Sequence, residues 1–177
     1  MTVVVSGIGV VGPLGEGRAA HWNALKAGTS AIASLTAAGG DPLPLAAGAR
    51  AAGFDVKPHL TDRKMARLLN PASAFALAAS RLALADCGLD LATVEPARRG
   101  LYCQTGMFQV EGKDLAPIVE HCCEAGSLSL ARFGAQGMSV INPFLPIKTL
   151  PNMGLGTIAI AFDFQGPNLV VGPFANQ

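Results

Sequence analysis

The most informative stretch of the chain is LPNMGLGTIAIAFDFQGPNLVV, residues 150–171. From Asn152 to Phe162 its residues favour a helix, and Gly166 followed by Pro167 is typical of a turn. The apolar NLVV at 168–171 then predicts a short strand. The stretch therefore predicts a helix, a turn and a strand in direct succession.

A long helix is predicted upstream of this stretch. The side chain of Asn70 offers a hydrogen-bond acceptor and Pro71 a fixed φ, which together favour a helix start. The Ala- and Leu-rich segment that follows ends at Cys87, before Gly88. Its many small residues predict a closely packed, buried helix.

Between these two regions, the sequence predicts one more strand and one more helix. GLYCQTG at 100–106 is typical of a buried strand, and a helix is expected from Asp114 to Glu124. Glu120 and Glu124 would then share a helix face, where an exposed carboxylate pair is more often solvated than catalytic.

The chain opens with VVVSGIGVVGPLG, residues 3–15, which contains a literal G-x-G-x-x-G motif. A dinucleotide site would need a helix that starts inside the motif and continues beyond Gly12, where Pro13 and Gly15 stand instead. It would also need an acidic residue about 20 positions on. The first acidic residue after Glu16 is Asp41, in a Gly- and Pro-rich stretch. We therefore expect a buried strand at Val3–Val5 and a structural turn, with no nucleotide bound.

The segment after the motif predicts short elements and a long loop. A helix is expected from Gly17 to Lys26, stopped by Gly28, and residues 35–53 should form a surface loop. Thr61 is predicted to cap a turn that runs through Met65. Taken with the later elements, the alternation of strands and helices predicts an α/β layered domain with a parallel or mixed sheet.

Composition narrows the function classes. Half of the 177 residues are apolar, 14% are charged and the net charge is +1, so the chain has no electrostatic footprint for nucleic acid. Apolar runs fall short of the ~20 residues that span a bilayer, and the N-terminus has no secretory pattern. We expect a cytoplasmic protein without a membrane span, part of whose apolar surface is covered by a partner.

The cysteines predict neither a disulfide framework nor a metal site. Without a secretory signal or a C-x-x-C spacing, all four are expected to be reduced thiols, mostly buried (Cys87, Cys103, Cys122 and Cys123). In EHCCEAG at 120–126, neighbouring helical residues point about 100° apart and cannot converge on one ion. We predict no cofactor.

Three stretches resemble one protein family in order and spacing. They are VVVSGIGVVGPLG, RKMARLLNPASAFALAASRLALADCGLD and NPFLPIKTLPNMGLGTIAIAFDFQGPNLVV. The chain resembles, over nearly its whole length, the amino-terminal half of β-ketoacyl-acyl-carrier-protein synthases. These are condensing enzymes of the thiolase fold, a duplicate of two halves in layers. The resemblance implies a single domain over residues 1–177, without the carboxy-terminal half that carries the family's two catalytic histidines.

None of the chain's histidines lies in a segment that resembles those catalytic histidines. We expect His21 on a helix surface, His59 in a loop and His121 on a helix.

The resemblance also places the family's nucleophilic cysteine, and Ala175 stands there. The approach differs as well, because Pro173 removes a backbone N–H and Phe174 replaces a small residue. Gln177 stands two positions beyond the place where glutamine replaces the cysteine in chain-length-factor relatives. No catalytic residue is therefore predicted in this chain, because a methyl group cannot form the acyl thioester.

An acyl groove or a subunit interface is the remaining site that the resemblance implies. We expect it near a set of large apolar side chains (Met107, Phe108, Met138, Phe144 and Phe174).

Three functions stay open. The first is a non-catalytic partner subunit that pairs with itself or with a ketosynthase-type subunit in fatty-acid, polyketide or polyene synthesis. The second is an acyl-carrier-protein-dependent acyltransferase or decarboxylase whose other residues come from another chain or from sequence beyond Gln177. The third is a module that binds an acyl chain or a carrier protein without reacting.

Overall fold

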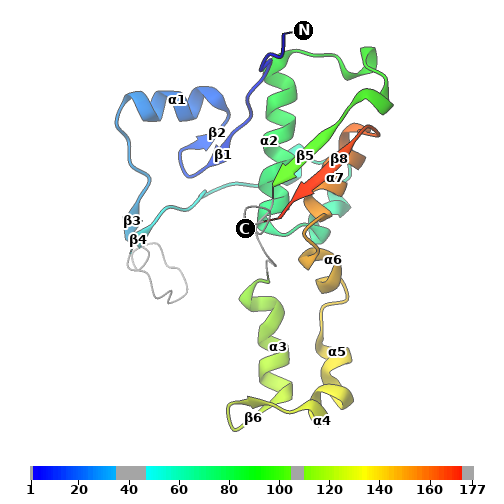
Figure 1. The fold of residues 1–177 in the computed structure, drawn as a ribbon. Helices are drawn as coiled ribbons and strands as arrows, with labels where there is room; N and C mark the ends of the chain where they lie inside the picture. Colours follow the sequence, from blue (N-terminus) through cyan, green and yellow to red (C-terminus); the bar gives the residue numbers. More distant parts are fainter. Residues whose placement is uncertain (1, 35–46, 105–109, 173–177) are drawn as a thin grey trace. The chain divides into compact units, whose positions relative to one another are not determined.

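The computed structural model describes residues 2–34, 47–104 and 110–172, and these form two compact units. Residues 1–61 and 75–95 make up the first unit, and residues 62–74 and 96–177 the second. The long helix α2 (Pro71–Cys87) gives its first turn to the second unit and the rest to the first. Figure 1 traces both units along the chain.

The helix α2 follows its sequence signals closely. It starts at Pro71, the Asn70 side chain accepts a hydrogen bond from the Ser73 amide at 2.8 Å, and Gly88 takes a positive φ of 65° just beyond the end. Leu77 and Ala78 are fully buried. The prediction of a helix from Asn70 to Gly88 is confirmed, and its burial is most complete at Leu77 and Ala78.

The first unit also contains the short helix α1 (Arg18–Lys26), which confirms the predicted helix and its stop at Gly28, where φ is 65°. Two short antiparallel pairs flank it. They are β1 (Val11–Gly12) with β2 (Gly15–Glu16), and β3 (Ala33–Ser34) with β4 (Ala47–Gly48). The pair β3–β4 corrects part of the predicted loop at 35–53, of which residues 35–46 lie outside the described ranges.

The predicted buried strand at Val3–Val5 is wrong for this structure. These residues form no strand, and their side chains are 89%, 73% and 82% exposed. The β-branched residues supply strand propensity, but a strand forms only where a neighbour accepts its backbone hydrogen bonds.

The glycines of the opening motif have a packing role. A Cβ on Gly7 would collide with the Ala83 carbonyl and with Cys87, and one on Gly9 would collide with the Ala79 carbonyl. The chain therefore passes against the surface of α2 at a distance that only glycine permits. This confirms the prediction that the motif is structural.

In the second unit, β5 (Leu101–Gln104) pairs in parallel with β8 (Asn168–Val171). The helix α7 (Met153–Phe162) packs on this sheet, and β8 follows it after the turn at Gly166 and Pro167 (Figure 1). Both strands and this helix form where they were predicted, but the predicted burial of β5 is wrong: Tyr102 and Gln104 are exposed and the other two residues are half-buried, because one face of the sheet is open. For GLYCQTG, the strand covers 101–104, and residues 105–106 lie outside the described ranges.

The remaining elements of the second unit form a helical arm, defined here as residues 112–140. It begins with α3 (Gly112–Cys122), turns through the hairpin β6 (Cys123–Glu124) and β7 (Ser127–Leu128), and returns through a helical segment. That segment consists of α4 (Leu130–Arg132), the π-helical turn η5 (Phe133–Gly137) and α5 (Met138–Val140). Helix α3 packs on η5, and α6 (Leu145–Thr149) follows the arm (Figure 1).

Two sequence predictions in this unit need correction. The helix α3 ends at Cys122, so Glu124 lies on β6 and pairs with Arg132 at 3.0 Å instead of sharing a helix face with Glu120. The cap near residue 61 is Asp62, whose side chain accepts from the Lys64 amide.

Four 3₁₀ turns complete the described structure. They are η1 (Lys57–His59), η2 (Arg63–Leu68), η3 (Leu91–Thr93) and η4 (Pro96–Arg98).

Candidate functional site

The strand β8 leads towards the position where the sequence places the missing nucleophile. Its last residue is Val171, and the described structure ends at Gly172. Ala175 and Phe174 therefore lie outside the described residues, as do Met107 and Phe108. The structure describes the chain up to Gly172, and the nucleophile position at Ala175 stays a prediction from the sequence.

Arg99 fixes the turn that precedes β8. Its Nη1 donates to the carbonyl oxygens of Phe162 at 3.2 Å and of Asp163 at 3.1 Å, at the C-terminal end of α7. Asp163 has a left-handed φ of 54°, and its carboxylate lies 3.8 Å from the same Nη1. A cation at this end of a helix satisfies carbonyls that the helix leaves free and is favoured by the helix dipole.

The sheet of β5 and β8 has one covered and one open face. The register pairs Tyr102 with Leu169, and partners in a parallel pair point to the same side of the sheet. Tyr102 is 69% exposed and Leu169 is 52% exposed. Parallel sheets are normally covered on both faces. In the part of the chain that the structure describes, the face that carries Tyr102 and Leu169 is covered only in part.

Cys103 follows Tyr102 on β5, pairs with Val170 on β8 and points to the opposite side of the sheet. Burial raises the pKa of its thiol, because the environment disfavours the thiolate. A protonated thiol is a poor nucleophile.

Two of the predicted groove residues are described. Met138 lies on α5 in the arm and is 82% exposed, so it lines no closed groove in this structure. Phe144 is half-buried just before α6, and the Arg67 guanidinium lies over its ring, 5.1 Å from the centroid. The remaining three predicted groove residues lie outside the described ranges.

A buried charged cluster in the second unit was not predicted. Lys148 on α6 has a side chain only 11% exposed, and its Nζ lies 3.4 Å from Asp114 Oδ2 and 3.9 Å from Glu111 Oε2. The Lys148 carbonyl also accepts a 2.7 Å hydrogen bond from Asn70 Nδ2. Asp114 and Lys148 are 34 positions apart, so no local spacing signals their meeting.

The three histidines occupy separate sites. His21 is half-buried on α1 and His121 is exposed on α3, and both lie on helices as expected. His59 was expected in a loop but is buried in η1, where its Nε2 donates to Glu16 Oε2 at 2.9 Å. Its carbonyl accepts from Arg81 Nε, which gives the residue a structural role.

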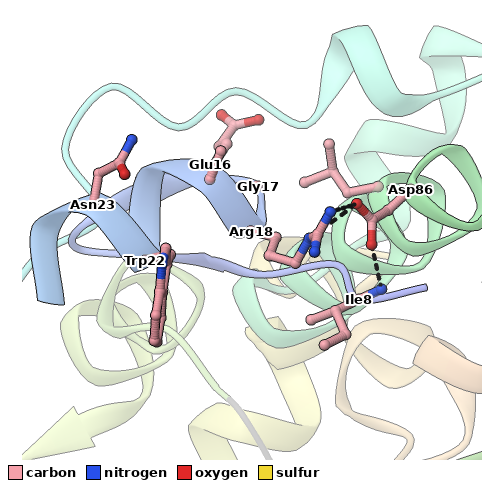
Figure 2. A pocket seen from close by; sticks show the side chains of 9 residues that line it. Ile8, Glu16, Gly17, Arg18, Trp22, Asn23 and Asp86 are labelled. Atoms are coloured by element: carbon pink, nitrogen blue, oxygen red, sulfur yellow. Dashed lines mark hydrogen bonds and ion pairs between the residues drawn. The ribbon is translucent and has the colours of Figure 1, made fainter. Parts of the chain in front are cut away.

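The first unit contains a cavity of about 690 Å³ next to α1. Figure 2 shows Arg18 reaching Asp86, with a 2.9 Å ion pair, and Asp86 also accepting from the Ile8 amide. Trp22 forms another wall and is 60% exposed. Neither of the two described groove residues, Met138 and Phe144, lines this cavity, and the 68 positions between Arg18 and Asp86 leave no local sequence signal for it.

The described residues contain neither a cluster of metal-ligating side chains nor a membrane-spanning helix. Within residues 2–34, 47–104 and 110–172, no three His, Cys, Asp or Glu side chains gather as metal ligands. No helix in these ranges has the length and apolar character to cross a bilayer.

The relation to known proteins is direct. The family model described as "Beta-ketoacyl synthase, N-terminal domain" matches residues 1–172. The chain belongs to this family. The resemblance stated from the sequence is therefore confirmed.

Among curated ketosynthase relatives, 3-oxoacyl-(acyl-carrier-protein) synthase 2 of Coxiella burnetii is 30% identical over 170 residues. The match covers 96% of this ketosynthase domain and 37% of the relative. The chain thus spans little more than a third of the length of the curated relatives that it matches.

Solved ketosynthase structures share the fold. The ishigamide ketosynthase/chain length factor aligns with a TM-score of 0.70 and 20% identity, covering 96% of this chain and 39% of that one. A type II PKS acyl-carrier protein in complex with its ketosynthase bound to the hexaketide aligns at 0.64 and 16%, covering 94% and 40%. These likenesses confirm the thiolase-like, mixed α/β amino-terminal half of a ketosynthase.

Proposed function

We propose that this ketosynthase amino-terminal domain acts as a non-catalytic partner subunit in carrier-protein-dependent fatty-acid or polyketide synthesis. The observation that carries the proposal is Ala175, which stands where the family has its nucleophilic cysteine. A methyl side chain cannot accept an acyl group, so condensation cannot start on this chain by the family's route.

The open face of the β5–β8 sheet supports a partner. Tyr102 and Leu169 place aromatic and aliphatic side chains side by side on that face, both more than half exposed. Covering such a face removes apolar surface from water, which is the main driving force for association. The partner we propose is a ketosynthase-type subunit or a second copy of this chain.

A basic segment supports the second proposed partner, an acyl-carrier protein. Arg63, Lys64 and Arg67 are exposed on or beside η2, and Asp62 turns its carboxylate back to the Lys64 amide. An acidic docking surface would be attracted to this segment, and the attraction would weaken with added salt.

The decisive experiment combines a loading assay with a binding assay. The protein is incubated with an acyl-loaded carrier protein, and its mass is measured for a covalent acyl group. Its association with an active ketosynthase from the same source is measured by light scattering. We expect no acyl adduct and a stable complex. A covalent adduct would instead favour an acyltransferase, and absence of both a complex and a homodimer would overturn the partner role.

A pair of matched variants tests the surface. Leu169→Glu places a charge on the open sheet face and should weaken association at least tenfold, because it buries an unpaired carboxylate. Leu128→Glu, at the tip of the arm, is the control, since Leu128 is 51% exposed against 52% for Leu169. If Leu169→Glu binds the ketosynthase as tightly as Leu128→Glu does, the interface lies elsewhere.

A further inference from the structure

The helical arm of residues 112–140 has little core of its own. Only three of its residues are buried, namely Asp114, Cys122 and Gly137, and none of these has a large apolar side chain. Several of its large apolar residues are exposed, among them Leu130 and Met138. Segments with few buried apolar contacts open more readily than the rest of a fold.

The polar links between the arm and the chain that follows it converge on one carboxylate. Asp114, in the first turn of α3, accepts from Asn142 Nδ2 at 3.2 Å through one oxygen and lies 3.4 Å from Lys148 Nζ through the other. Glu111, directly before α3, lies 3.9 Å from the same Nζ. The beginning of α3 is thereby tied to Asn142, just beyond the arm, and to Lys148 on α6.

Lys148 also contacts a part of the second unit that lies outside the arm, namely the start of α2. Its carbonyl accepts from Asn70 Nδ2, while Asn70 Oδ1 accepts from the Ser73 amide at the start of α2. One buried residue therefore joins the N-terminal turn of α2 to the N-terminal turn of α3. Its charge is paired in the arm and its backbone is bonded outside the arm.

We propose that Lys148 and Asp114 form a charged clamp that closes the arm onto α6, and that the arm opens as a separate segment when the clamp is broken. Buried charges act strongly here because removal of one partner leaves the other desolvated and unpaired. The clamp is thus a conformational device built into the fold, independent of whether the protein has a partner.

The two single variants are expected to differ. Lys148→Met leaves the Asp114 carboxylate buried without its cation, whereas Asp114→Asn leaves Lys148 with Glu111 at 3.9 Å. The lysine variant should therefore open the arm more often. The double variant Asp114→Asn/Lys148→Met removes both charges, so its arm should open less often than the arm of Lys148→Met alone.

Hydrogen exchange on the intact protein tests the clamp. In Lys148→Met, amides of α3 and α4–α5 should exchange about a hundredfold faster, while those of α7 and β8 stay within a few fold of the unaltered protein. Lys113→Met is the matched control, because Lys113 pairs with Glu111 at 2.6 Å but is 72% exposed.

Each outcome decides the matter. Exchange in Lys148→Met that equals exchange in Lys113→Met would overturn the clamp. Equal acceleration in the arm, α7 and β8 would also overturn it, since the pair would then stabilise the whole unit. If Lys148→Met does not fold, a folded double variant supports the clamp, and an unfolded double variant contradicts it.

Discussion

Gly9 lies against the carbonyl oxygen of Ala79 on α2, at a distance that a Cβ could not share. Gly7 lies against the carbonyl oxygen of Ala83, one helical turn further along α2. The glycines of the opening G-x-G-x-x-G motif thus allow the backbone to pass close along the surface of a helix. In a dinucleotide site, the glycines would instead admit a pyrophosphate at a helix N-terminus.

Gly9→Ala should therefore destabilise the first unit by about 1–3 kcal/mol, because the added methyl group forces the chain away from α2. Trp22, the one tryptophan of the chain, belongs to this unit, so its fluorescence in a urea titration reports the change. Gly12→Ala in the same unit is the control, since a Cβ there would meet only the His21 side chain, at 3.2 Å, and no backbone atom. Equal stabilities would mean that the contact with α2 is not needed.

The elements that local chemistry specifies were predictable from the sequence. Asn70 and Pro71 define the start of α2, and Gly88 defines its end, whatever packs around it. The helix–turn–strand succession from α7 to β8 was equally clear. In each case, the signal lies within a few residues of the feature that it predicts.

Elements that depend on distant partners were not predictable. Val3–Val5 have the residues of a strand but no strand partner in the described structure. The hairpin β6–β7 was missed because its turn places Ala125 at a φ of 49° before Gly126 at 79°. Such turns are usually signalled by Asn or Asp at the first of these positions, so Ala gives no warning.

The candidate site likewise has one feature with a local sequence signal and others that depend on distant residues. The hypothesis that Ala175 stands at the family's nucleophile position rests on the sequence alone, because Ala175 follows the GPN stretch at a countable distance and lies outside the described residues, and it stays a prediction. The Asp114–Lys148 cluster and the capping of α7 by Arg99 join residues 34 and more than 60 positions apart. Contacts between residues so far apart in the sequence have no local signal and become visible only in the folded structure.

Replacing Arg99 with lysine should destabilise the second unit by about 2 kcal/mol. The side chain is 10% exposed, and its Nη1 serves two carbonyls at the end of α7 that a lysine would reach less well. Urea unfolding followed by circular dichroism measures the loss. Arg98→Lys, one position earlier and exposed, should change stability by less than about 0.5 kcal/mol. A similar loss in both variants would argue against a specific role for Arg99.

Cys103 makes stability depend on pH in the alkaline range. Because burial raises the pKa of its thiol in the folded chain, the unfolded chain loses this proton at a lower pH than the folded chain does. The thiol's contribution is therefore complete below the ordinary thiol pKa of about 8.5 and is lost as the pH rises through the folded value.

The free energy of unfolding should thus fall more steeply above about pH 8.5 in the unaltered protein than in Cys103→Ala, which cannot titrate there. Urea titrations of both proteins at intervals from neutral to alkaline pH measure the two slopes. Since the other three cysteines are present in both proteins, their titration cancels in the difference. Parallel slopes would show that the thiolate of Cys103 is tolerated on β5, and the open sheet beside it would then admit water to both faces.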